Sequence, residues 1–185
     1  MKYSIYLFLL LSLAGCVPAK TSHYKPTANM GVAINDHCGS FLAPKSTYQV
    51  VFEDVDFRVT GYENYLKIHL RIPKDRNVEI ESQEINLINA DKNHQQKIEE
   101  FSYYDRTSNK SISLSSKNLL KGSNERFALG NIEPRIFSSS VKFSVPMNNT
   151  YQVKFPSMKI NGKSYSIPII TFKKESGFGL YPINC

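Results

Sequence analysis

Residues 66–72, with the sequence LKIHLRI, alternate apolar and polar side chains without interruption. Leucine and isoleucine occupy the even positions, and lysine, histidine and arginine occupy the odd ones. Successive side chains of a β-strand point to opposite faces of the sheet. This stretch therefore predicts an antiparallel strand with one buried face and one solvent face, and it indicates the β class for the chain.

The segment before it has a shift of phase. Apolar side chains lie at even positions in residues 48–52 and at odd positions in residues 55–59. One strand tolerates such a shift only through a bulge near Glu53 and Asp54, or by changing sheets there. We expect an interrupted strand over this region.

Short apolar runs continue along the chain, and none keeps a helical stripe. Residues 89–101 are polar except for Ala90, Ile98 and Phe101, so they favour a hairpin that turns around residues 91–94. Further strands are predicted at residues 78–88, 98–104, 111–114, 126–129, 141–145, 151–155, 158–160, 165–172 and 179–183.

The pair Asn161-Gly162 lies between Ile160 and Lys163. Asn-Gly is the preferred pair for a type I′ hairpin, which needs positive φ at both central residues. A two-residue turn fixes the register, so residue 160 should face 163, residue 158 should face 165 and residue 156 should face 167. One face of this hairpin would then carry Pro156, Met158, Ile160, Tyr165, Ile167 and Ile169.

The chain has 185 residues, of which 41% are hydrophobic and 21% are charged. This composition excludes wholesale disorder and coiled coil, and the length suits one domain after a short leader. Many short strands separated by turns predict an all-β fold, an immunoglobulin-like antiparallel β-sandwich, over residues 38–185. A small β-barrel is the alternative.

The N-terminus has the composition of a secretory signal. Lys2 supplies a positive start, residues 3–13 form an apolar run, and two small residues precede Cys16. A run of about 11 residues is well short of the roughly 20 needed for a membrane-spanning helix. We therefore expect residues 1–15 to be a cleaved signal peptide.

The tetrapeptide Leu13-Ala14-Gly15-Cys16 resembles the lipobox of bacterial lipoproteins. The resemblance implies that Cys16 is acylated and becomes the new N-terminus, so that lipid anchors the protein in the cell envelope. Val17 stands where an aspartate commonly retains such proteins in the inner membrane, which implies the periplasmic face of an outer membrane. In a Gram-positive cell the anchor would lie on the outer face of the plasma membrane. Residues 16–37, rich in polar residues and proline, are expected to form a flexible lipidated tether.

Two cysteines remain, Cys38 and Cys185, at the ends of the predicted domain. An exported chain meets an oxidising compartment, so we expect these two to form one disulfide. The four histidines have no metal-ligand spacing, and we expect neither a metal site nor a cofactor: His23, His37, His69 and His94.

Catalytic patterns are missing from the sequence, and no catalytic residue is predicted. Asp54 and Asp56 fit the charged side of a strand, and His69 fits the solvent face of its strand. The serines at 138–140 have no identifiable base directed toward them. A tyrosine platform for sugar, at 62 and 65 or at 103 and 104, competes with ordinary burial of tyrosine edges, and no ligand-binding residue is assigned.

The formal charge of +7 favours an anionic partner, which outside the cytoplasm is more often an acidic protein or envelope polymer than nucleic acid. We expect a membrane-tethered, non-catalytic binding module that uses loops or an exposed strand edge to bind an envelope protein. One version is an immunity or inhibitor lipoprotein. The alternative is a structural or assembly lipoprotein of an envelope complex or cell-wall contact, and a hydrolase with an unrecognised site is a third.

Overall fold

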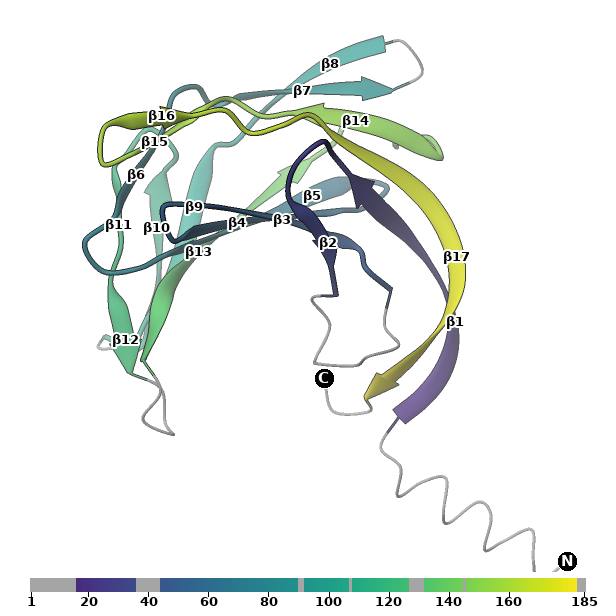
Figure 1. The fold of residues 1–185 in the computed structure, drawn as a ribbon, viewed down its shortest axis with the longest axis horizontal. Helices are drawn as coiled ribbons and strands as arrows, with labels where there is room; N and C mark the ends of the chain where they lie inside the picture. Colours follow the sequence, from purple (N-terminus) through teal and green to yellow (C-terminus); the bar gives the residue numbers. More distant parts are fainter. Residues whose placement is uncertain are drawn as a thin grey trace, which may run out of the picture.

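The computed structural model describes residues 16–35, 44–89, 92–106, 108–126, 132–144 and 146–182. Its regular elements are β-strands, and the paired strands are antiparallel, which confirms the all-β class (Figure 1). The fold is β-sandwich-like, with strands wrapped around one cluster of buried apolar side chains. The described residues contain no helix long and apolar enough to cross a bilayer.

The described strands form three sheets. Sheet A has the order β1 (Cys16–Thr27), β17 (Ile170–Pro182), β14 (Thr150–Lys154), β7 (Glu84–Asn89) and β8 (Lys92–Lys97). Sheet B has the order β10 (Lys110–Ser115), β9 (Glu100–Asp105), β13 (Ile132–Lys142), β5 (Tyr65–Ile72), β4 (Val55–Gly61), β3 (Thr47–Phe52) and β2 (Val32–Ile34), with β12 (Asn124–Arg126) paired to β13. Sheet C has the order β11 (Leu120–Lys121), β6 (Asn77–Ile80), β15 (Met158–Ile160) and β16 (Lys163–Tyr165).

The alternating stretch at residues 66–72 forms β5 as predicted. Its four apolar side chains are at most 1% exposed, and its polar side chains lie on the opposite face. β5 pairs with β4 on one side and β13 on the other, so it is an interior strand of sheet B.

The bulge predicted at Glu53 and Asp54 is wrong, because these two residues form a tight hairpin turn between β3 and β4. Phe52 pairs with Val55 across the turn, and the turn residues have φ of 45° and 67°. In a two-residue hairpin, residues 48, 50 and 52 lie on the same face as 59, 57 and 55, so the turn accounts for the phase shift. Arg76 Nε donates to the Glu53 carbonyl at 3.0 Å and holds the turn.

The turn at Asn161-Gly162 is confirmed. Met158 pairs with Tyr165 and Ile160 with Lys163, and both turn residues have positive φ. The predicted pair of residues 156 and 167 does not form, because β16 ends at Tyr165. Ile169 is 47% exposed and does not join the buried face that we expected.

Replacing Gly162 with alanine should lower the free energy of unfolding by about 1 kcal/mol, because an L-residue is strained in the left-handed region. Gly162 has φ of +87°, and a Cβ there would meet no atom within 4 Å, so steric overlap adds nothing. Urea denaturation measures the loss. Gly177→Ala is the matched control, since that glycine also has open space but no positive φ. Equal effects of the two substitutions would contradict the prediction.

The remaining strands follow the predicted runs with shifted ends. The hairpin of β7 and β8 is confirmed, but its turn lies between Asn89 and Lys92 rather than at 91–94. The runs at 78–88 and 165–172 are each divided between two strands, and residues 179–182 are the end of β17, with residue 183 outside the described residues. The strand expected at 126–129 falls largely outside the described residues.

The first strand corrects the expectation of a flexible tether at residues 16–37. Residues 16–27 form β1, which pairs along its whole length with β17, and β2 begins soon afterwards. The sequence of β1 has few apolar residues, so main-chain pairing rather than an apolar stripe defines this strand. Its two prolines are compatible with its position at the edge of sheet A. The signal peptide at 1–15 and the cysteines Cys38 and Cys185 lie outside the described residues.

Tyr48 is a buried tyrosine of the core. Its side chain is 1% exposed, and its hydroxyl donates to the Met30 carbonyl at 3.0 Å. Burial raises the pKa of Tyr48 to about 12, because the charged phenolate is poorly solvated there.

Stability should therefore fall above pH 10, and Tyr48→Phe should reduce that fall. The unfolded chain loses this proton near the ordinary tyrosine pKa of about 10, before the folded protein does. The contribution of Tyr48 is thus complete below pH 10 and is lost between about pH 10 and 12. In urea denaturation over this range, the variant should lose about 1.4 kcal/mol per pH unit less than the unmodified protein. Parallel curves for the two proteins would contradict the assignment.

Candidate functional site

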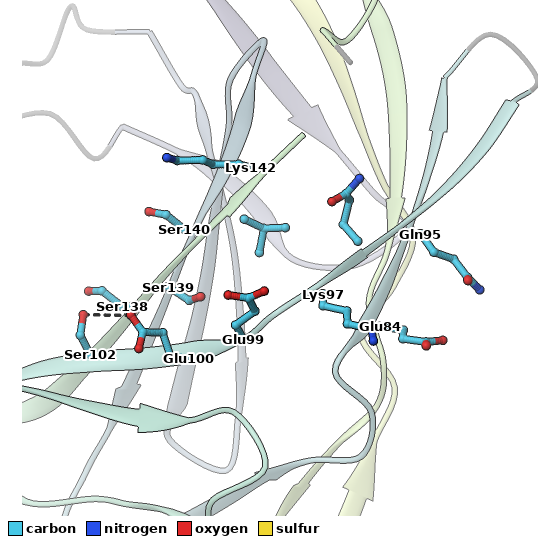
Figure 2. Close-up of a pocket in the computed structure, with 12 residues that line it drawn as sticks. Glu84, Gln95, Lys97, Glu99, Glu100, Ser102, Ser138, Ser139, Ser140 and Lys142 are labelled. Atoms are coloured by element: carbon cyan, nitrogen blue, oxygen red, sulfur yellow. Dashed lines mark hydrogen bonds between the residues drawn. The ribbon is translucent and has the colours of Figure 1, made fainter. Parts of the chain in front are cut away.

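A cleft of about 830 Å³ lies between the chain segment that links β8 to β9 and the C-terminal half of β13 (Figure 2). Ile98 and Glu99 connect the two strands and carry the chain from sheet A to sheet B. We call this the β8–β13 cleft. Its lining residues are Glu84, Gln95, Gln96, Lys97, Glu99, Glu100, Ser102 and residues 138–142.

The cleft opens where two neighbouring strands of sheet B diverge. β9 and β13 pair at one position, Ser102 with Ser138. Beyond it, toward Lys142, β13 continues to pair with β5, but in the described residues no strand pairs with its other side. Figure 2 shows β13 leaving the β8–β9 segment at an angle from this point.

Hydrogen bonds beyond the end of β13 show which way its main-chain groups point. Phe143 N–H donates to the Asn64 carbonyl at 2.8 Å, which continues the register with β5. Main-chain groups of an antiparallel strand alternate in direction, so the odd-numbered residues bond β5. Those of Ser140 and Lys142 therefore point into the cleft. The Ser102 hydroxyl donates to the Ser138 carbonyl, which agrees with this alternation.

The opposite side of the cleft is also a strand edge. β8 is the terminal strand of sheet A and, among the described strands, pairs with β7 alone. Ile98 N–H donates to the Gln83 carbonyl at 2.8 Å, one step beyond the last pair of that register. Even-numbered residues of β8 therefore bond β7, and the main-chain groups of Asn93, Gln95 and Lys97 point away from it. Two unpaired strand edges thus border one cleft.

The carboxylates of the cleft have no cationic partner. Glu84, Glu99 and Glu100 are exposed, and their side chains form no ion pair or hydrogen bond in the described part of the chain. Elsewhere, six glutamates form ion pairs within 4.0 Å: Glu53, Glu63, Glu81, Glu125, Glu133 and Glu175. Lys97 and Lys142 also line the cleft, so its three glutamates exceed its lysines by one negative charge, on a chain whose formal charge is +7.

Ser139 adds a buried polar group to the same wall. Its side chain is 7% exposed, and its hydroxyl has no hydrogen-bond partner among the described residues. Figure 2 shows that hydroxyl pointing toward Glu99. The residue is mostly buried, but its Oγ atom still reaches solvent in the cleft and is therefore available to bond a ligand group.

The structure corrects two expectations about Ser138 and His69. Their side chains meet across β13 and β5, with 2.9 Å between Ser138 Oγ and His69 Nδ1, so a base does approach this serine. His69 is partly buried by this contact rather than simply solvated. Arg58, not a carboxylate, lies opposite His69 on β4, and the Asp56 carboxylate forms an ion pair with Arg58 at 2.8 Å. The arrangement differs from a catalytic triad, in which a carboxylate orients the histidine.

Other residues singled out in the sequence lie apart from the cleft. Asp54 lies in the turn between β3 and β4 and forms an ion pair with Arg76 at 3.5 Å, whereas Asp56 lies on β4 and forms an ion pair with Arg58. Tyr62 and Tyr65 stack on each other with centroids 4.3 Å apart, and each therefore covers one face of the other. Tyr103 packs against Phe137 and beneath Arg135.

Cys16, the expected lipidation site, begins β1 opposite Pro182. The described residues contain no group of three or more His, Cys, Asp or Glu side chains that could hold a metal ion.

The sequence analysis did not predict the β8–β13 cleft. One sequence feature could have indicated an edge of the cleft. All residues of β8 are polar, and a strand of polar residues is typical of a sheet edge. Comparisons with protein-family models, with curated proteins and with solved structures found no match.

Proposed function

We propose that this chain is a membrane-tethered, non-catalytic binding module of the bacterial envelope that binds a protein partner in the β8–β13 cleft. The observation that carries the proposal is the cleft itself, which is bordered by two unpaired strand edges. Strand edges accept an extended segment of another protein, whose main chain then completes the ladder. An immunity or inhibitor lipoprotein that captures one partner is a particular form of this function.

The anchor in this proposal is lipid on Cys16, at the periplasmic face of an outer membrane. Beyond Lys173, β17 pairs only with β1 among the described strands, so residues 16–24 and 174–182 form a two-stranded ribbon. Nine residues of strand extend about 30 Å. A ribbon starting at the lipid would hold the binding domain away from the head groups with less freedom than a flexible tether.

The proposal includes the finer features expected of the fold. Antiparallel sheets around one core support an immunoglobulin-like sandwich, although strands β2 to β5 run as a meander rather than in the ABED order of that class. The cysteines Cys38 and Cys185 would close the domain as a disulfide. Peptide mapping without reduction, together with mass determination of the N-terminal peptide, tests the disulfide and the acylation of Cys16. Free thiols or an unmodified Cys16 would contradict these parts.

Crosslinking of envelopes followed by purification of the lipidated protein tests the central claim. Gln95→Pro removes an N–H that points into the cleft, and Gln95→Ala keeps it as the control. We expect the unmodified protein and Gln95→Ala to capture one stoichiometric protein partner, and Gln95→Pro to lose it. Capture that is equal in all three, or recovery of envelope machinery or peptidoglycan instead, would favour the structural or assembly alternative.

A further inference from the structure

We propose that the segment bound in the β8–β13 cleft is a basic peptide strand, whose lysine or arginine side chain binds between Glu99, Glu100 and the Ser139 hydroxyl. This inference rests on the proposed function and names the chemistry of the partner. The net charge of the whole chain favours an acidic partner, whereas the adjacent Glu99 and Glu100 of the cleft, which form no ion pair in the described residues, point to a basic one.

Two adjacent carboxylates of the cleft can bind a cationic side chain. Glu99 and Glu100 are adjacent where β9 begins, and Figure 2 shows Glu99 beside Ser139 and Glu100 beside Ser138 and Ser102. Neither has an ion pair in the described part of the chain. A cation brought there by a ligand would gain charge-assisted hydrogen bonds without displacing an existing partner.

The Ser139 hydroxyl is a further group of the cleft that can bind the same cation. The residue is 7% exposed, and its hydroxyl reaches solvent in the cleft, is directed toward Glu99 and has no hydrogen-bond partner in the described residues. A hydroxyl oxygen accepts a hydrogen bond from an ammonium or guanidinium group, and a lysine or arginine side chain has donors to spare after bonding a carboxylate. The same ligand group would therefore satisfy the serine and the two glutamates.

The strand edges decide the form of the ligand. The main-chain groups of Ser140 and Lys142 point into the cleft from one side, and those of Gln95 and Lys97 from the other. The main-chain groups of an extended peptide point alternately to its two sides, so one peptide strand between the edges can pair with both, and its alternate side chains face the same way. A free amino acid or a metal ion would leave these edges unpaired, so the geometry favours a peptide.

Selection from a displayed library of random ten-residue peptides tests the inference with the purified mature chain. We expect the selected peptides to be enriched in lysine or arginine. They should bind the double variant Glu99→Gln, Glu100→Gln about tenfold more weakly than the unmodified protein. Glu79→Gln is the matched control, since Glu79 is exposed, has no ion pair among the described residues and lies on β6, outside the cleft.

The outcomes separate this inference from the proposed function. Peptides that lose affinity on Gln95→Pro but show no basic enrichment would overturn the inference and leave the strand-binding function standing. Equal weakening by Glu79→Gln and by the cleft variant would also overturn it, because a general charge effect would then explain the selection. Failure to select any peptide that is sensitive to Gln95→Pro would overturn the proposed function itself.

Discussion

A variant with proline at both free edges, Gln95→Pro and Ser140→Pro, should bind its partner at least 100-fold more weakly and remain folded. Each substitution removes a main-chain donor that points into the cleft and places a pyrrolidine ring against an incoming strand. Loss of one such bond corresponds to about tenfold in affinity, and separate edges should contribute additively. A titration of the partner, or of a selected peptide, measures the change.

Ser139→Pro is the control for this double variant. The register of β13 directs the Ser139 N–H to β5, opposite Ile68, so proline there removes a bond inside sheet B. It should lower the free energy of unfolding by about 3 kcal/mol, whereas the edge variants should change it little. A double variant no weaker than Gln95→Pro alone would assign binding to the β8 edge. Unchanged binding in the double variant would contradict strand addition.

The sequence predicted the structure correctly where a strand or turn is determined by residues close together in the chain. The alternation in residues 66–72 predicted β5, and Asn161-Gly162 predicted the register of β15 and β16. The turn at Glu53 and Asp54 was missed because glutamate is an unusual choice for positive φ and the pair lacks the glycine of the common two-residue hairpins. Its conformation is instead held by long-range contacts from Arg76, Lys163 and Tyr165 to Glu53, which no local pattern reveals.

The N-terminal strand was missed for a different reason. β1 pairs with residues more than 140 positions away, and its side chains follow no apolar period. Main-chain hydrogen bonds form regardless of side-chain type, so a polar edge strand has little sequence signature. The lipobox reading of Cys16 and the pairing of Cys38 with Cys185 remain predictions.

The candidate site was the least predictable part. The cleft forms because β9 and β13 of sheet B pair at a single position and then diverge. It also requires β8, the edge strand of sheet A, to lie near the point of divergence. Both features depend on the order of strands in the sheets, which the alternation of apolar and polar residues does not predict. The contact of His69 with Ser138 likewise follows from the register of β5 with β13. Sequence reasoning identified both residues but had no means to bring them together.

The ribbon and the two larger sheets meet at an aromatic cluster formed by Tyr24, Phe143, Tyr151 and Phe172. Phe172 is fully buried and stacks on Tyr151, with ring centroids 5.2 Å apart. It also lies close over Gly61 of β4, where a Cβ would come within 2.5 Å of Phe172 Cδ1. Phe172 therefore joins sheet A to sheet B at the residue where β17 also pairs with β1.

Phe172→Ala should accordingly lower the free energy of unfolding by about 4 kcal/mol, through lost burial and the cavity left behind. Typical domains are stable by about 5–15 kcal/mol, so a large fraction of the stability would be lost. Urea denaturation followed by circular dichroism measures the effect, with Ile169→Ala as a control at a neighbouring, 47% exposed side chain that should cost less than about 0.5 kcal/mol. A loss below about 1 kcal/mol for Phe172→Ala would mean that the two sheets do not depend on this contact. The ribbon would then be an independent appendage, and its proposed role in holding the binding domain away from the membrane would lose its mechanical basis.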